Sequence, residues 1–97
     1  MTRVILFPSA KKDLLRARQW YRDQRPGLDR EFRAEVEKAL GFIAENPRLY
    51  PVVYQRVRRA ITRRFPYKIF YEDLGHRILI LAVRHHSQRP LVGLEVP

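Results

Sequence analysis

Cysteine is absent from the 97 residues, so neither a disulfide framework nor a thiolate metal site can form. Long apolar runs are absent as well. No stretch of 18 apolar residues exists that could span a membrane, and the run VILF near the N-terminus is too short for a signal peptide. These absences predict a cytoplasmic protein that makes no use of a membrane.

Motifs for common enzyme chemistry are also missing. No HExxH, P-loop or GxSxG sequence occurs. Of the three histidines, His76 stands in a predicted turn and His85-His86 are adjacent, and strand neighbours point to opposite faces, so the pair cannot chelate one ion. Paired carboxylates would have to come from helix surfaces or from Glu72-Asp73. We therefore expect no metal, no cofactor and neither a nucleophilic triad nor a glycosidase site.

Basic residues outnumber acidic residues in the sequence. The formal net charge is +10, and residues 1–46 carry ten Lys and Arg against seven acidic residues, whereas residues 47–97 carry ten against three. Such an excess favours an acidic or polyanionic partner, either nucleic acid or an acidic protein segment. A basic surface that serves only solubility is the alternative.

A strand and a helix are predicted at the N-terminal end. Residues 3–8 form a β-branched and aromatic run that proline ends, which is typical of a strand. Ser9 stands where its hydroxyl can cap the first helical turn, and Pro26-Gly27 ends the helix. Leu15 and Trp20 are expected to widen its apolar face. That face consists of residues three and four apart: Ala10, Leu14, Ala17 and Tyr21.

The second helix has the most regular pattern in the chain. Asn46-Pro47 ends it, because proline disfavours helical geometry in the residue before it. Two helices joined by a tight turn form a hairpin, and the apolar stripe of this one needs a sheet to cover it. The stripe consists of Leu28, Phe32, Val36, Ala39, Leu40 and Ile43.

Strands are predicted for the second half of the chain. Residues 48–52 are expected to be a connector, and residues 53–62 a single strand rich in arginine. Residues 65–71 alternate, which predicts a strand with one face in the core. The core face of that strand consists of Phe65, Tyr67, Ile69 and Tyr71.

A hairpin turn and a buried strand complete the pattern. Residues 73–75 have turn chemistry, and residues 78–85 are apolar on both parities, which favours a central strand covered on both faces. Residues 91–97 are expected to supply the second cover. The prediction is a single α+β domain over residues 1–97 with the order β-α-α-β-β-β. In it the N-terminal strand and the helical hairpin pack on a small, mostly antiparallel sheet.

Basic and titratable side chains on the sheet are the candidates for function. Lys68 lies on the opposite face of its strand from the core tyrosines, and Arg84 and His86 share one face of theirs. Such cations can hold phosphates, and a histidine or tyrosine can exchange protons in metal-free RNA cleavage by the ribose 2′-hydroxyl. His85 is interpreted equally well as a packed core residue. The other predicted contacts to nucleic acid or a protein target are Arg56, Arg58, Arg63, Arg64 and Arg89.

The chain resembles toxins of the RelE/ParE superfamily from bacterial type II toxin–antitoxin systems. The resemblance covers nearly the whole length and rests on motifs in a fixed order: FPSAKKDL, WY, GLDREF, NPRLYP, RRFPYKIFY and LAVRHHSQRP. It implies the same β-α-α-β-β-β fold and a growth-inhibiting activity. It also implies a cognate antitoxin, a small protein whose acidic or amphipathic segment silences the toxin.

The two branches of the superfamily imply different targets. RelE-type members are ribosome-dependent mRNA endoribonucleases; Lys68 matches one of their catalytic arginines, and His86 or Ser87 takes the place of their basic residue after the last strand. Their C-terminal tyrosine has no counterpart. ParE-type members poison DNA gyrase, and His85 matches their terminal histidine, although Arg89 comes one position later than their arginine. The resemblance favours gyrase, with ribosome and mRNA as the alternative and a non-toxic nucleic-acid-binding module as the third.

Overall fold

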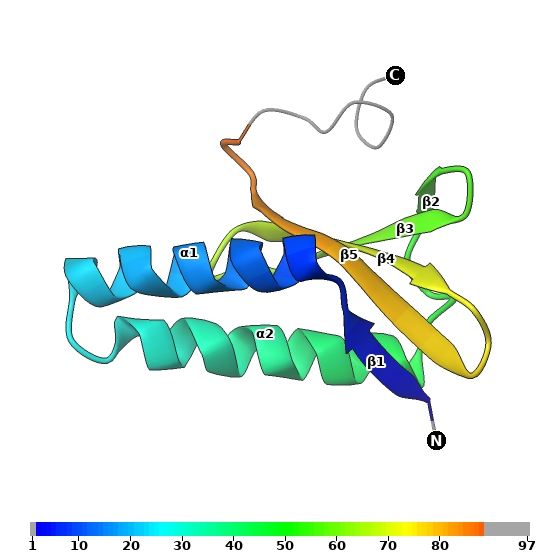
Figure 1. Ribbon diagram of the computed structural model, residues 1–97, viewed down its shortest axis with the longest axis horizontal. Coiled ribbons are helices and arrows are strands. Elements are labelled where there is room, and N and C mark those ends of the chain that lie inside the picture. The colour runs from blue at the N-terminus through cyan, green and yellow to red at the C-terminus, as the bar shows by residue number, and fades with distance from the viewer. Residues whose placement is uncertain (1, 89–97) are drawn as a thin grey trace.

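The computed structural model describes residues 2–88 (Figure 1). Both helices lie on one side of a single twisted sheet, which confirms the α+β class and the predicted order of helices and strands. The predicted cover at residues 91–97 lies outside the described residues. The elements are β1 (Arg3–Leu6), α1 (Pro8–Gln24), α2 (Leu28–Glu45), β2 (Val52–Tyr54), β3 (Val57–Ile61), β4 (Tyr67–Asp73) and β5 (Arg77–His85).

The five strands form one mixed sheet in the order β1-β5-β4-β3-β2. β1 pairs with β5 in parallel, and the other neighbours pair antiparallel, as the expectation of a mostly antiparallel sheet requires. β5 therefore lies inside the sheet between β1 and β4. Its interior position agrees with its apolar residues on both parities.

The connector predicted at residues 48–52 is present as far as Pro51, but the prediction of one strand at 53–62 is wrong. Two short strands, β2 and β3, form a hairpin there, joined through Gln55 and Arg56. Gln55 has φ = 48°, a left-handed conformation that Gly, Asn and Asp adopt most readily. Because none of these residues marks the turn, the sequence pattern runs through it without a visible break.

The turns predicted from glycine are confirmed. Gly27 has φ = 87° between the helices, and Gly75 has φ = 90° between β4 and β5, in the region that L-residues with a side chain rarely adopt. The Asp73 carboxylate accepts the Gly75 N–H at 2.9 Å and closes the second turn.

The main core lies between the helices and the sheet. The second-helix stripe is confirmed, with Phe32, Val36 and Ile43 buried and the rest of it packed against them. The predicted core face of β4 and the residues before it is also confirmed, since all four side chains are at most 7% exposed. Rings of Tyr21, Phe32, Phe65 and Tyr67 contact one another with centroids 5.0–6.3 Å apart. Such aromatic pairs add specific geometry to the apolar burial.

Two expectations for α1 are wrong. The helix begins at Pro8, whose fixed φ suits the first helical position, so Ser9 lies inside the helix and not at its cap. The Ser9 hydroxyl donates instead to Leu81 O in β5 at 2.7 Å. Leu15 and Trp20 are 56% and 58% exposed, because α1 buries only a narrow stripe against α2 and the sheet.

An irregularity in β5 decides which side chains face the helices. Phe70 pairs with Ala82 but Tyr71 pairs with Ile80, so Leu81 is an extra residue on the β5 side. Ile80 and Val83 consequently both lie in the helix-side core, although they are three residues apart. Phe70 and Ala82 join Val57 in a smaller cluster on the second face, away from the helices.

Candidate functional site

The predicted catalytic residues gather at the end of the β4–β5 pair but divide between its two faces. Lys68 is the register partner of Arg84, and Tyr67 is the partner of His85. Tyr67 packs in the helix-side core, and its ring meets that of His85 nearly edge to face, at 5.2 Å between centroids. Since strand neighbours alternate, Lys68 and Arg84 lie on the second face. The sheet thus separates His85 from these two cations.

The second-face set consists of half-buried Lys68 and Arg84, with His86 following in the turn after β5. The His86 N–H donates to Pro66 O at 2.9 Å, which continues the β4–β5 pairing by one position. Arg59 in β3 pairs with Phe70, which is two residues after Lys68 in β4, and so belongs to the same face. Paired cations of this kind are suited to binding phosphate groups.

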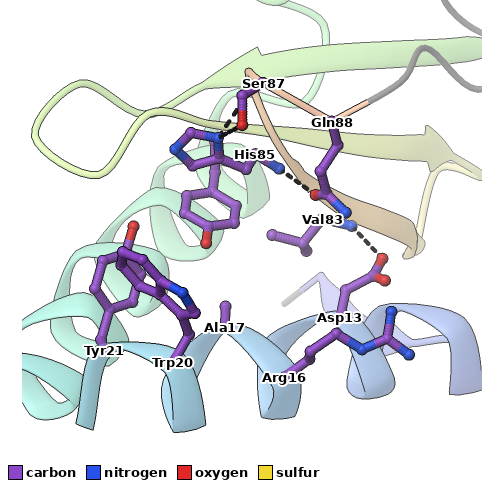
Figure 2. Close-up of a pocket in the computed structure, with 10 residues that line it drawn as sticks. Asp13, Arg16, Ala17, Trp20, Tyr21, Val83, His85, Ser87 and Gln88 are labelled. Atoms are coloured by element: carbon purple, nitrogen blue, oxygen red, sulfur yellow. Dashed lines mark hydrogen bonds between the residues drawn. The ribbon is translucent and has the colours of Figure 1, made fainter. Parts of the chain in front are cut away.

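On the helix side, a pocket of about 340 Å³ opens between α1 and the end of β5 (Figure 2). Figure 2 shows Trp20 and Tyr21 rising from α1 on one side, with His85, Ser87 and Gln88 on the other. The remaining lining residues are Asp13, Arg16, Ala17, Tyr67 and Val83. Only His85 of these was a sequence-predicted candidate.

The His85 ring is held in one orientation by the turn that follows it. Its Nδ1 accepts the Ser87 N–H at 3.0 Å and lies 2.7 Å from Ser87 Oγ. In the neutral ring the proton is therefore on Nε2, which is left as a hydrogen-bond donor.

The Tyr67 hydroxyl is a donor and not a base. Burial, together with the neighbouring Tyr21 hydroxyl, raises the pKa of Tyr67 well above its usual range. The phenol therefore stays protonated at neutral pH. The raised pKa disfavours the phenolate form of Tyr67 beside His85.

The β5 edge beside the pocket is closed by side chains. β1 ends at Leu6, opposite Ile80, so among the described residues no strand covers β5 beyond that point. Backbone groups of a sheet edge need partners when they are shielded from water. The partners here are Ser9 Oγ for Leu81 O (2.7 Å), Asp13 Oδ2 for Val83 N–H (2.9 Å) and Gln88 Oε1 for His85 N–H (2.6 Å).

The sequence matches a known protein family over most of its length. Residues 4–90 match the family model described as the ParE toxin of the type II toxin–antitoxin system parDE. The chain belongs to this family. Within residues 2–88 neither helix is long and apolar enough to cross a membrane, and no cluster of three acidic or histidine side chains is placed to hold a metal ion.

Two solved structures have folds similar to the fold of this ParE-family chain. A chromosomal ParDE system from P. aeruginosa is similar with a TM-score of 0.71 and 18% identity, over 88% of this chain and 96% of that one. The intact E. coli RelBE toxin–antitoxin complex is similar with a TM-score of 0.60 and 13% identity, over 91% and 100%. No curated protein sequence matches the chain at a significant level. At these identities the likeness concerns the fold alone.

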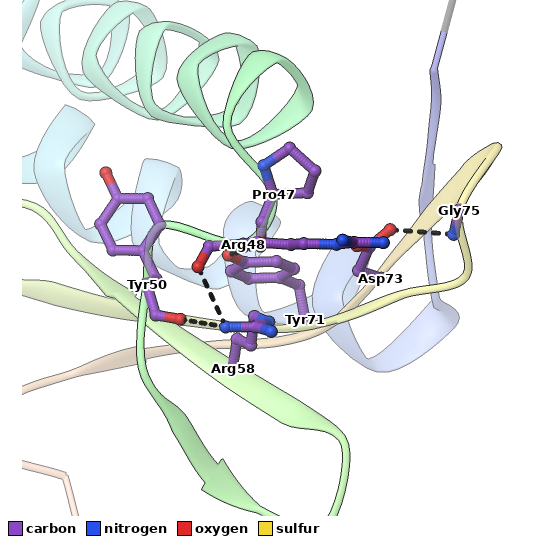
Figure 3. A network of polar contacts seen from close by, with 7 residues as sticks. All are labelled: Pro47, Arg48, Tyr50, Arg58, Tyr71, Asp73 and Gly75. Carbon is purple, nitrogen blue, oxygen red and sulfur yellow. Dashed lines mark hydrogen bonds and ion pairs between the residues drawn. The ribbon is translucent and has the colours of Figure 1, made fainter.

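In this ParE-family chain the predicted target contact Arg58 is engaged inside the fold (Figure 3). Its Nη1 donates to Tyr50 O at 2.6 Å and to Arg48 O at 3.2 Å, which holds the connector between α2 and β2. The Tyr71 hydroxyl donates to Pro47 O at 2.7 Å in the same connector. Burial raises the pKa of Tyr71 to about 12, although the Arg58 cation opposes the shift.

Arg64 also has a partner within the fold. Its guanidinium forms an ion pair with Glu31 of α2 and lies over the Phe65 ring, 4.9 Å from the centroid. The bond from Arg64 holds the pKa of Glu31 below its usual value. The loop before β4 is thereby tied to the helical hairpin.

The other predicted contacts are more accessible. Arg56, in the β2–β3 turn, places its Nε 3.8 Å from Glu72 with a side chain that is 75% exposed. Arg63 is exposed in the loop before β4, and Arg89 lies outside the described residues. Arg63 and Arg56 are thus the members of the predicted set that a large partner can reach most easily.

Proposed function

We propose that this ParE-family protein is a growth-inhibiting toxin that poisons DNA gyrase by protein–protein contact and is silenced by a cognate antitoxin. The observation that carries the proposal is the separation of His85 from Lys68 and Arg84 by the sheet. A toxin that acts by contact alone does not need these groups to converge.

Acid–base chemistry does need such convergence. A catalytic acid or base must lie within about 2.6–3.2 Å of the proton that it moves, or reach it through one water. A phosphate held by Lys68 and Arg84 on the second face is out of reach of His85, whose ring packs on Tyr67. Tyr67 packs on the same helix side as His85, away from that phosphate, and burial raises the pKa of Tyr67. These features support contact over catalysis.

Purified protein tests the proposal in a gyrase supercoiling reaction. Micromolar protein should block supercoiling or trap cleaved DNA, and an inert protein would contradict the proposal. Arg63→Glu should weaken inhibition, because it reverses an exposed charge of the predicted target-binding set. His76→Ala, at the exposed β4–β5 turn on the far end of the strand pair, is the matched control and should inhibit like the wild type.

A ribosome-dependent mRNA endoribonuclease is the second candidate, and the pairing of Lys68 with Arg84 favours it. His86 lies two residues beyond Arg84, in the turn after β5, and is exposed. In this mechanism the two cations bind and polarise the phosphate while His86 exchanges protons. Lys68→Ala and His86→Ala should then each abolish ribosome-dependent cleavage. Unchanged toxicity and cleavage in both variants would exclude it.

The antitoxin is proposed to be a small protein with an acidic or amphipathic segment, in keeping with the charge of +10. The two similar solved structures are of toxin–antitoxin systems, which supports the same kind of partner here. Induced expression of the chain alone should stop growth. Co-expression of the protein encoded next to it should restore growth, and harmless expression of the chain alone would contradict the toxin assignment.

A further inference from the structure

The pocket between α1 and the end of β5 plays no part in either proposed activity. Its volume of about 340 Å³ lies within the usual range of pockets that bind small molecules or side chains. Trp20, on its wall, is 58% exposed and contacts Tyr21 edge to face at 5.1 Å between centroids. An exposed tryptophan beside an aromatic pocket is typical of a protein-binding surface.

The bonding of the β5 edge indicates what kind of group can enter. The N–H groups of Val83 and His85 are already taken by Asp13 and Gln88. A strand that paired with this edge would have to displace both acceptors, one of them a carboxylate, whose bond is the stronger kind. A side chain can occupy the pocket without breaking either bond. Recognition by a single side chain is therefore favoured over strand addition.

The surrounding charges indicate the sign of the ligand. Arg16 lines the pocket and is exposed, whereas the one carboxylate of the lining, Asp13, accepts a bond from β5. Lys12 is exposed one residue before Asp13, and the chain as a whole carries +10. Acidic residues on either side of the inserted group would be attracted to this flank of α1.

We infer that this pocket binds one large apolar side chain, aromatic by preference, from an acidic segment of a polypeptide partner. Under the proposed function that partner is the antitoxin, and in this respect the inference rests on the proposed function. The wall formed by Trp20, Tyr21 and Tyr67 contacts the side chain, and Arg16 attracts its acidic neighbours.

Trp20 is the only tryptophan in the chain and therefore reports on its own pocket. The probes are three acetylated nonapeptides: phenylalanine between glutamates, alanine between glutamates, and phenylalanine between lysines. The first should change Trp20 fluorescence saturably, and each of the other two should bind about tenfold more weakly. Equal affinity of the first two would show recognition of backbone and would overturn the inference. Tighter binding of a single-stranded oligonucleotide at the same site would also overturn it.

A pair of variants with matched exposure provides the second test. Trp20→Ala removes the pocket wall, and Leu15→Ala removes an equally exposed apolar side chain of α1 that does not line the pocket. Calorimetry should show about tenfold weaker binding of the phenylalanine–glutamate peptide to the first and unchanged binding to the second. Far-UV circular dichroism confirms that both fold.

An unchanged affinity of Trp20→Ala would refute the pocket as the binding site. The outcome is independent of the gyrase assay. A chain that binds the peptide but leaves gyrase active would contradict only the proposed target, whereas a gyrase poison that ignores the peptide would contradict only the pocket.

Discussion

Replacing Arg58 by methionine separates a structural role of this cation from a target-binding role. The guanidinium donates from one nitrogen to two connector carbonyls, at 2.6 Å and 3.2 Å. A hydrogen bond to a charged group contributes about 1.5–3 kcal/mol. Because both bonds share one nitrogen and the longer one is exposed, we take the value of a single good bond, about 2 kcal/mol. Methionine keeps an unbranched stem of similar reach but cannot donate.

The matched control is Arg63→Met, which removes the same charge from an exposed loop. Urea unfolding followed by circular dichroism should show Arg58→Met less stable by about 2 kcal/mol, with Tm lower by about 10 °C for a domain of this size. Arg63→Met should stay within about 0.5 kcal/mol of the wild type. If the two variants were equally stable, the connector bonds of Arg58 would contribute nothing, and its assignment to the fold would be refuted.

Three further predictions concern the ionisation of two core tyrosines, a hydrogen bond between α1 and β5, and the packing of one core ring. The pKa values of Tyr67 and Tyr71 are higher in the folded state than in the unfolded chain, so the folded state holds both phenol protons more tightly. Their contribution to the free energy of unfolding is therefore complete below about pH 10, the ordinary pKa of tyrosine. It is lost as the pH rises toward about 12. A stability profile by urea titration should fall through that interval, and Tyr71→Phe should make the fall shallower. Asp13→Ala removes the acceptor that lies 2.9 Å from the Val83 N–H of β5 and should lower the free energy of unfolding by about 1–3 kcal/mol. Asp23→Ala, at an exposed position of the same helix, should lower it by less than about 0.5 kcal/mol. Phe32→Ala empties a fully buried site in the aromatic core and should cost about 3–5 kcal/mol in the same unfolding measurement, and a cost under about 1 kcal/mol would show that the rings do not pack as described.

The periodic elements were predictable because their burial follows directly from local geometry. Phe32, Val36 and Ile43 recur at helical spacing on α2, and Tyr67 and Tyr71 alternate on β4, so each set faces the core in the structure as it does in the pattern. Proline and glycine mark the ends of these elements by their effect on φ. Regular periods and backbone restrictions are properties of the sequence itself.

The β2–β3 hairpin and the roles of the arginines were not predictable in the same way. Gln55 adopts a positive φ without a residue type that would announce it. Nothing in the sequence distinguishes the role of Arg58 from that of Arg63. Arg58 has a structural role only because the connector passes close enough to accept its hydrogen bond. Hydrogen bonds between residues distant from each other along the chain, such as that of Asp13 with β5, leave no periodic trace.

The sequence by itself therefore determined the class of fold, the buried faces of α2 and β4, and the family to which the motifs point. Tertiary structure alone decided which part of the candidate site turns toward the helices. The extra residue Leu81 sets which β5 side chains turn toward the helices, and strand alternation then places His85 against Tyr67 and Arg84 on the second face. The physical reason is that a side chain's face depends on register with its neighbouring strand, and register is fixed by pairing across the sheet.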